Sequence, residues 1–193
     1  MGNNFWHNTI ELPSKSYICG YCSKPLASNL GYYKARQPDG SGEATAKIYI
    51  CHFCLRPTYF DIDDKQAPGV RPGEDVSGIT DEGVISLYNE SRDSYSQGAF
   101  TATILCCRKL LMHIAVSKGA EKNKKFIEYV EFLATAGYIP PGASAWVDKI
   151  RTKGNEANHE IVIMNKDDAT DLLSFCTMLL KIIYEFPSKI KIV

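Results

Sequence analysis

The sequence lacks a long apolar run and lacks a net charge of either sign. No stretch of its 193 residues approaches the roughly 18 to 20 apolar residues that a membrane span needs. The N-terminal MGNNFWHNTIELPSKS has no apolar core of a signal peptide. Lysine plus arginine total 22, as do aspartate plus glutamate, whereas a protein that grips many phosphates normally has a basic excess. These absences argue against a membrane protein and against extended, non-specific duplex binding, and they predict a cytoplasmic protein.

Low-complexity tracts are also absent, and so are internal repeats apart from two similar cysteine-containing turns. Hydrophobic residues make up 45% and charged residues 23% of the chain, a balance typical of globular proteins. The length suffices for one sizeable core, or for a small module beside a domain of ordinary size. The distribution of cysteines favours the second arrangement.

Four of the seven cysteines form two Cys-x-x-Cys pairs, Cys19 with Cys22 and Cys51 with Cys54, which are separated by 28 residues. In a cytosolic chain such pairs indicate a metal site rather than disulfides. Two turns of this kind can surround one Zn²⁺ with four thiolates. Between them, LGYYKA and ATAKIYI have the pattern of hairpin strands, and RQPDGSGE has that of a turn. Residues 1–60 are therefore predicted to form a small β zinc ribbon.

The four-cysteine set predicts a structural zinc ion, one per chain, because no coordination position remains for water or substrate. Four thiolates around Zn²⁺ carry a formal charge of minus two, which backbone N–H groups, Lys24 and Arg56 can offset. Two alternatives remain open. His52, inside the second pair, can replace a cysteine as ligand, and the four thiols can instead form redox-active pairs. The placement of both pairs around one hairpin favours metal.

Beyond the ribbon, apolar residues follow helical spacing from Thr80 onward. Residues 61–79 are rich in Asp, Pro and Gly and are predicted to form a linker. Residues 80–193 are predicted to form a helical domain with short connections, so the fold class is mainly α, a helical bundle preceded by a small β module. The expected helices are 80–97 with Thr80 as N-cap, 98–119 and 124–137 each closed by glycine, one from near Ala143 to His159, and 165–186, which stops before Pro187.

Arg151, Asn155 and His159 are spaced four residues apart, so on a helix they share one face. Cleavage of RNA without a metal needs proton transfer and a cation that stabilises the charged transition state. His159 titrates near neutral pH, Arg151 fits phosphate oxygens, and Asn155 can orient either. A chain has one such histidine, so two proton transfers would require a homodimer with facing helices. The same residues also have a structural interpretation, as a helix cap and an ion pair.

Three stretches resemble the bacterial domain-of-unknown-function family 4145, itself similar to HEPN helical domains: LYNESRDSY, ATILCCRKLLMHIA and AGYIPPGASAWVDKIRTKGNEANHE. The resemblance covers roughly residues 79 to 187 and implies a HEPN-like helical bundle; a cysteine-pair ribbon ahead of it fits the arrangement common in that family. HEPN domains typically carry a motif of an Arg, a polar residue directly after it, any three residues and then a His. Many domains with this motif are metal-independent ribonucleases that act as dimers, and others only bind or scaffold. Asn155 and His159 match that motif, whereas Gly154 stands at its arginine position and Arg151 lies one turn earlier.

Three functions remain open on these grounds. The first is a HEPN-like protein that binds nucleic acid or cleaves RNA without a metal, in phage defence or a prophage, as the family's genomic setting implies. The second is a non-catalytic ribbon and bundle that recruits a protein partner, and the third, a metalloenzyme, is disfavoured by the closed zinc site. NEANH favours the first function, while Gly154 and the balanced charge favour the second. Elsewhere, His113, Cys106, Cys107 and Cys176 are predicted to be core residues, and Arg108 to face the cavity around His159.

Overall fold

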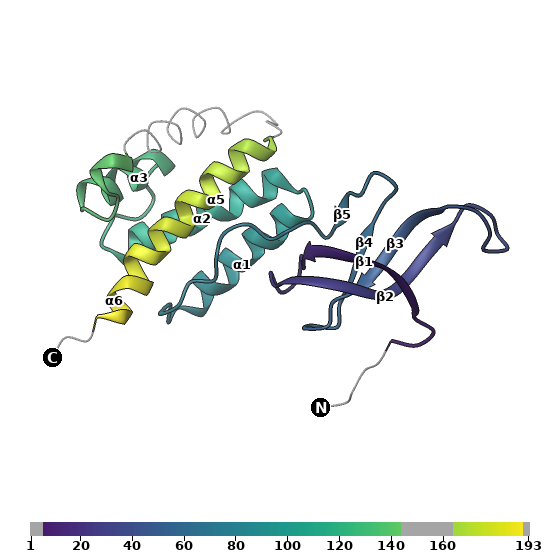
Figure 1. Ribbon diagram of the computed structural model, residues 1–193. Helices are drawn as coiled ribbons and strands as arrows, with labels where there is room; N and C mark the ends of the chain where they lie inside the picture. The colour runs from purple at the N-terminus through teal and green to yellow at the C-terminus, as the bar shows by residue number, and fades with distance from the viewer. Residues whose placement is uncertain (1–5, 144–163, 191–193) are drawn as a thin grey trace. The chain divides into compact units, whose positions relative to one another are not determined.

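The computed structural model describes residues 6–143 and 164–190, which divide into two compact units (Figure 1). Met1–Arg71 form a β unit and Pro72–Val193 form a helical unit. A β ribbon followed by a helical region is what the sequence predicts, but the chain as a whole is mixed α and β rather than mainly α. Strands continue beyond residue 60 into the segment 61–79 that the sequence analysis assigns to a linker. Because each unit has a core of its own, each is described separately.

The β unit is a single antiparallel meander in which each strand pairs with the next along the chain. The predicted hairpin is present, with Tyr32 opposite Ile48. The edge strands approach one another at one point, where the side-chain Nε2 of Gln66 donates to the carbonyl oxygen of Ile18 at 2.9 Å. The strands are β1 (Ile10–Ile18), β2 (Pro25–Ala35), β3 (Ala44–Ile50), β4 (Pro57–Phe60) and β5 (Gln66–Ala67).

The core of the β unit is small. Leu12, Tyr49 and Phe60 are buried against one another, with Tyr17 packed beside them. Gly31 lies opposite Tyr49 in the β2–β3 pair, and a Cβ at this glycine would lie 1.8 Å from the carbonyl oxygen of Ile48. Strand glycine is therefore required there for close backbone approach. With three fully enclosed apolar side chains in this cluster, the sheet needs a further source of stability.

The helical unit contains four helices of ten residues or more within residues 72–143 and 164–190 (Figure 1). Its core is extensive and includes Leu110, Leu111 and Ile114 from the second helix and Phe175 and Leu179 from the last, all fully buried. Gly119 and Gly137 adopt positive φ just past two helix ends, as predicted. The elements are α1 (Glu82–Ser96), α2 (Phe100–Ser117), α3 (Phe126–Thr135), the 3₁₀ turn η1 (Pro141–Ala143), α5 (Lys166–Leu180), the π-helical turn η2 (Lys181–Glu185) and α6 (Phe186–Lys189).

Helix α2 is long and apolar enough to cross a membrane by length and composition. That test is weak evidence for a membrane span, because the core helix of a soluble protein also passes it. In this fold α2 is a core helix, since Leu110 and Leu111 are fully buried among the other helices.

Two details of the predicted helix ends are wrong. The N-cap of α1 is Asp81 rather than Thr80: its carboxylate accepts from the backbone N–H groups of Gly83 at 2.8 Å and Val84 at 3.2 Å. The last helix does not stop before Pro187 but continues through η2 into α6. Pro187 follows directly on the π-helical turn η2 and lies in the first turn of α6, so the helix continues across a residue that has no backbone N–H group to donate.

The predicted burial of His113 is also wrong. Its side chain is exposed, and Nε2 lies 3.0 Å from Oδ2 of Asp81. His113 is surrounded in sequence by apolar residues, but the helix turns its ring outward to the N-terminal end of α1. The histidine therefore joins two helices through the N-cap residue instead of filling the core.

The segment from Pro72 to Gly78 lies on the helical unit and is fixed there by side chains of α1. Arg92 is 1% exposed, and its guanidinium donates to the carbonyl oxygens of Pro72 at 2.9 Å and Gly73 at 3.3 Å. It also forms a 2.6 Å ion pair with Asp75. We call residues 72–78 the strap. It is an ordered part of the helical unit, not a free linker.

Candidate metal centre

Each Cys-x-x-Cys pair forms a tight turn with the same backbone hydrogen bonds. In the first knuckle, Cys19–Lys24, the N–H of Cys19 donates to the carbonyl of Lys24 at 3.0 Å and that of Ser23 donates to the carbonyl of Cys19 at 2.9 Å. In the second knuckle, Cys51–Arg56, the equivalent bonds are 3.0 and 2.8 Å long. Ser23 and Leu55 occupy the same position and both have left-handed φ, 56° and 57°. The two knuckles are structural copies of one another.

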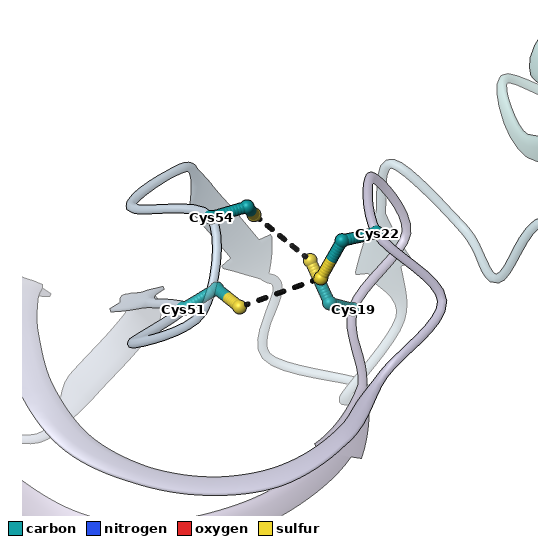
Figure 2. A group of neighbouring side chains, drawn as sticks. All are labelled: Cys19, Cys22, Cys51 and Cys54. Carbon is teal, nitrogen blue, oxygen red and sulfur yellow. Dashed lines mark hydrogen bonds between the residues drawn. The ribbon is translucent and has the colours of Figure 1, made fainter. Parts of the chain in front are cut away.

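The four sulfur atoms face one another across the gap between the knuckles (Figure 2). Cys19 Sγ lies 3.7 Å from Cys54 Sγ, and Cys22 Sγ lies 3.7 Å from Cys51 Sγ. All four lie within 4.8 Å of one another. Disulfides are excluded, because a sulfur–sulfur bond is about 2.05 Å long. A regular tetrahedron with metal–sulfur bonds of about 2.3 Å has edges of about 3.8 Å, so the spacing fits a tetrathiolate zinc site.

The protonation of the thiols supports the same assignment. Burial, with the neighbouring thiols, raises the pKa of Cys54 to about 12, and burial also raises the pKa of Cys19. At Cys51 burial acts in the same direction, but hydrogen bonds from backbone N–H groups and from neighbouring thiols outweigh it and lower the pKa. Four thiolates this close repel one another, so ionising all of them requires a cation between them. The cluster can hold a metal ion, and its ligand set suits zinc.

The first knuckle is enclosed by the end of the β unit. A Cβ on Gly20 would lie 2.5 Å from the carbonyl oxygens of both Pro68 and Gly69, so the chain after β5 passes directly over this turn. The N–H of Tyr21 points at Cys19 Sγ, with nitrogen and sulfur 3.4 Å apart. Backbone donors of the knuckles therefore help to offset the negative charge of thiolates.

Each knuckle places a cation over the aromatic ring of the other. Lys24 Nζ lies 4.7 Å from the ring centre of Phe53, and the Arg56 guanidinium carbon lies 5.0 Å from that of Tyr21. This reciprocal arrangement follows from the similar sequences of the two knuckles. CGYCSK and CHFCLR share an aromatic residue before the second cysteine and a cation two residues after it. Lys24 and Arg56 are predicted from the sequence only as charge partners of the thiolates, and their reciprocal pairing with the two rings is not predicted.

His52 does not join the metal group among the residues that the structure describes, which consists of the four cysteines. Its ring lies beside that of Phe53, with centroids 4.2 Å apart, and it is exposed. The four-cysteine prediction is therefore confirmed as a cluster, and the alternative with His52 as ligand is not supported.

The second predicted site falls outside the described residues. Arg151, Gly154, Asn155 and His159 all belong to segment 144–163, which the structure does not describe. The prediction that Arg108 faces a cavity around His159 thus stays a prediction; the Arg108 guanidinium lies 4.2 Å from the ring centre of Phe126.

The other three cysteines lie in the helical unit; the core position predicted for them is confirmed for Cys107 and Cys176 but not for Cys106. Cys107 and Cys176 are fully buried, and Cys106 is half-buried. The Cys176 thiol points at the carbonyl oxygen of Cys107, with sulfur and oxygen 3.9 Å apart. These two cysteines fill space between α2 and α5.

Comparison with protein families gives one match. Residues 89–193 match the family described as domain of unknown function (DUF4145). The matched range covers more than half of the chain, begins inside α1 and includes the segment that carries Arg151, Asn155 and His159. Comparison with curated proteins and with solved structures gives no match.

Proposed function

This chain belongs to the DUF4145 family of domains of unknown function, and from this premise we propose that it is a HEPN-like protein that binds RNA and cleaves it without a catalytic metal. The observation that carries the proposal is the range of the family match, which includes the NEANH motif. We place the protein in the cytoplasm, in a phage-defence or prophage system, on the strength of the family's resemblance to HEPN domains.

In this proposal zinc is structural, with one ion per chain held by Cys19, Cys22, Cys51 and Cys54. Four thiolates complete a tetrahedron and leave no position for a substrate or for an activated water molecule. The ion would join the two knuckles and thereby stabilise a β unit whose own apolar cluster is small. The chemistry is therefore assigned to the helical unit.

His159 is proposed to transfer the protons, Arg151 to stabilise charge on the phosphate, and Asn155 to orient one of them. Cleavage of RNA by proton transfer needs one group to accept the proton of the 2′-hydroxyl and another to donate a proton to the leaving oxygen. Two copies of the chain would bring two histidines to one phosphate, so the active form is proposed to be a homodimer formed by the helical unit.

The test is cleavage of mixed RNA by zinc-loaded protein in buffer freed of divalent cations on a chelating resin, so that the ribbon keeps its metal. We expect His159→Ala to abolish cleavage, and Arg151→Ala to reduce it roughly 10²- to 10³-fold, as loss of a transition-state donor does. Gly154→Arg should keep or raise activity. His113→Gln is the matched control, because it changes an exposed histidine of the same unit. Undiminished cleavage by His159→Ala would sink the catalytic proposal.

A non-catalytic adaptor is the second candidate function. The balanced net charge favours it. In that case the parent protein would show no cleavage, and substitutions at Arg151 and His159 would change only stability or the binding of a protein partner. Light scattering at tens of micromolar protein also distinguishes the two functions. A monomer would favour the adaptor, because the proposed active site needs the residues of two chains.

A further inference from the structure

We infer that the two knuckles form a binding surface for single-stranded RNA. This knuckle surface consists of Tyr21, Lys24, His52, Phe53 and Arg56. Its choice of RNA over other single strands rests on the proposed function, but its physical basis is independent of catalysis. The inference assigns the zinc-binding turns a role in recognition in addition to their role in folding.

The first observation is the exposure of the Phe53 ring on a rigid support. Phe53 is 51% exposed, and it stands at the tip of a turn fixed by two backbone hydrogen bonds and two metal-ligand cysteines. The apolar cluster around Tyr49 does not include it. The ring therefore contributes little to the core, while it offers a flat apolar face on which a nucleobase can stack.

The second observation is the distribution of charge along the β unit. Residues 12–60, which contain both knuckles and the central hairpin, carry six basic residues and two acidic residues, Asp39 and Glu43. Lys15 is paired with Asp64, so five cations and two carboxylates leave a formal charge of plus three; a zinc tetrathiolate carries minus two, and an excess of one positive charge remains for phosphates. The basic residues are Lys15, Lys24, Lys34, Arg36, Lys47 and Arg56.

The third observation is the pairing of rings with cations. Lys24 lies over Phe53 and Arg56 over Tyr21, at 4.7 and 5.0 Å. Within residues 6–143 and 164–190, neither cation has a carboxylate partner at ion-pair distance. Phe53 thus combines a half-exposed ring with a cation that no carboxylate neutralises, and Arg56 adds a second such cation over the half-buried ring of Tyr21. Duplex bases do not expose their faces, so the surface selects single strands.

The experiment measures binding of a fluorescein-labelled 12-nucleotide oligouridine to the full zinc-loaded chain by anisotropy. The His159→Ala background prevents cleavage. Phe53→Ala should weaken binding roughly 5- to 150-fold, the range expected for loss of one stacked base. Phe53→Tyr should bind like the parent, and Phe53→Leu should not. Ile62→Ala is the control, since Ile62 is an exposed apolar residue of the same unit outside the knuckles.

The salt dependence tests the cations. Lys24→Gln should reduce the slope of log K against log salt by about 0.7, the value for one phosphate contact to a single strand. Lys65→Gln, a change to an exposed lysine of the β4–β5 turn, should leave the slope unchanged. Zinc content is measured for every variant, and the comparison of Phe53→Tyr with Phe53→Leu decides the matter even if the alanine variant loses metal.

Three results overturn the inference: unchanged affinity in Phe53→Ala, full binding by Phe53→Leu, which indicates apolar docking of a protein, or equal affinity for a duplex of the same length. The outcomes separate it from the proposed function. If the parent protein binds the oligonucleotide through Phe53 but cleaves no RNA, the catalytic proposal fails and the inference stands. If the parent cleaves RNA and Phe53→Ala binds it unchanged, the inference fails alone.

Discussion

At the scale of single residues, the knuckles depend on one backbone conformation. Ser23 and Leu55 follow the second cysteine of each pair and adopt left-handed φ of 56° and 57°. For L-residues this conformation costs roughly 1–2 kcal/mol, and glycine avoids the cost. Leucine at such a position shows that the remaining contacts of the knuckle impose the turn, including the carbonyl of Leu55, which accepts a hydrogen bond from Trp6.

Leu55 gives a prediction that distinguishes backbone strain from side-chain contact. Leu55→Gly should keep the stability of the zinc-loaded ribbon or raise it by up to about 1 kcal/mol, because it relieves the left-handed strain. Leu55→Val should lower it by about 1–2 kcal/mol, because a β-branched residue fits that conformation poorly. Thermal denaturation measures both. The control is Leu30→Gly in β2, an exposed leucine in extended backbone, where glycine should destabilise.

At the scale of elements, side chains of α1 hold the strap, residues 72–78, on the helical unit. The strap contributes both apolar surface and acceptors: Val76 packs against the helical core, and two carbonyl oxygens and the Asp75 carboxylate converge on Arg92. Tyr88 adds a hydrogen bond to the carbonyl of Glu74 at 2.9 Å. A planar guanidinium carries its donors on three separate nitrogen atoms and so reaches these three acceptors at once. An ammonium group carries all its donors on a single nitrogen atom and does not span them.

Arg92→Lys should therefore destabilise the helical unit despite retention of charge. We expect a loss of about 2 kcal/mol or more, since hydrogen bonds of charged groups contribute roughly 1.5–3 kcal/mol each and the buried cation of the variant would lose part of them. Chemical denaturation followed by circular dichroism measures it. Lys109→Arg is the reverse substitution at an exposed position of α2 and should leave the stability unchanged. A neutral Arg92→Lys would show that the strap is held by other contacts.

The N-cap of α1 gives a prediction about pH. A hydrogen bond with His113, and then those from the N–H groups of Val84 and Gly83, lower the pKa of Asp81 from its ordinary value of 3.8. A carboxyl whose pKa is lower in the folded state adds stability above its unfolded pKa, and that stability is lost as pH falls through the folded pKa. The melting temperature of the helical unit should thus drop below pH 3.8, and less so in Asp81→Asn, which keeps a cap without the charge.

His113→Gln supplies the control for this assignment. Without the histidine, the folded pKa of Asp81 should rise towards its ordinary value, so the stability lost on acidification should be smaller than in the parent. The same pH profile in the parent and in both variants would show that other carboxyls determine the acid transition.

The sequence predicts elements more reliably than the contacts between them. The metal ligands Cys19, Cys22, Cys51 and Cys54 can be predicted from the sequence because Cys-x-x-Cys spacing has few physical interpretations. Helix ends at Gly119 and Gly137 are readable for the same reason, since glycine alone adopts such φ freely. The outward position of His113 is not readable, because helical spacing fixes relative direction along one helix but not which side meets its neighbours. Nor does composition reveal that residues 72–78 bind Arg92 through their carbonyl groups.

At the scale of the whole molecule, the two units differ in the origin of their stability. The helical unit has a continuous core that includes Leu110, Leu133 and Phe175, all fully buried. The β unit has a cluster of three buried residues around Tyr49 and a second cluster formed mainly by the cysteines themselves. A unit of this size with so small a core is expected to depend on its metal.

The last prediction concerns removal of that metal. Cys51→Ser should lose zinc and unfold the β unit, because zinc contributes free energy on the order of 10 kcal/mol to the folding of such small modules. The helical unit should keep its melting transition, since its core contains none of the four ligands. Metal analysis, with calorimetry of the full chain, measures both effects. Cys106→Ser changes a half-buried cysteine outside the cluster and should retain about one zinc per chain. Loss of both units in a single transition would instead mean that the helices depend on the ribbon, and that the metal stabilises the whole chain.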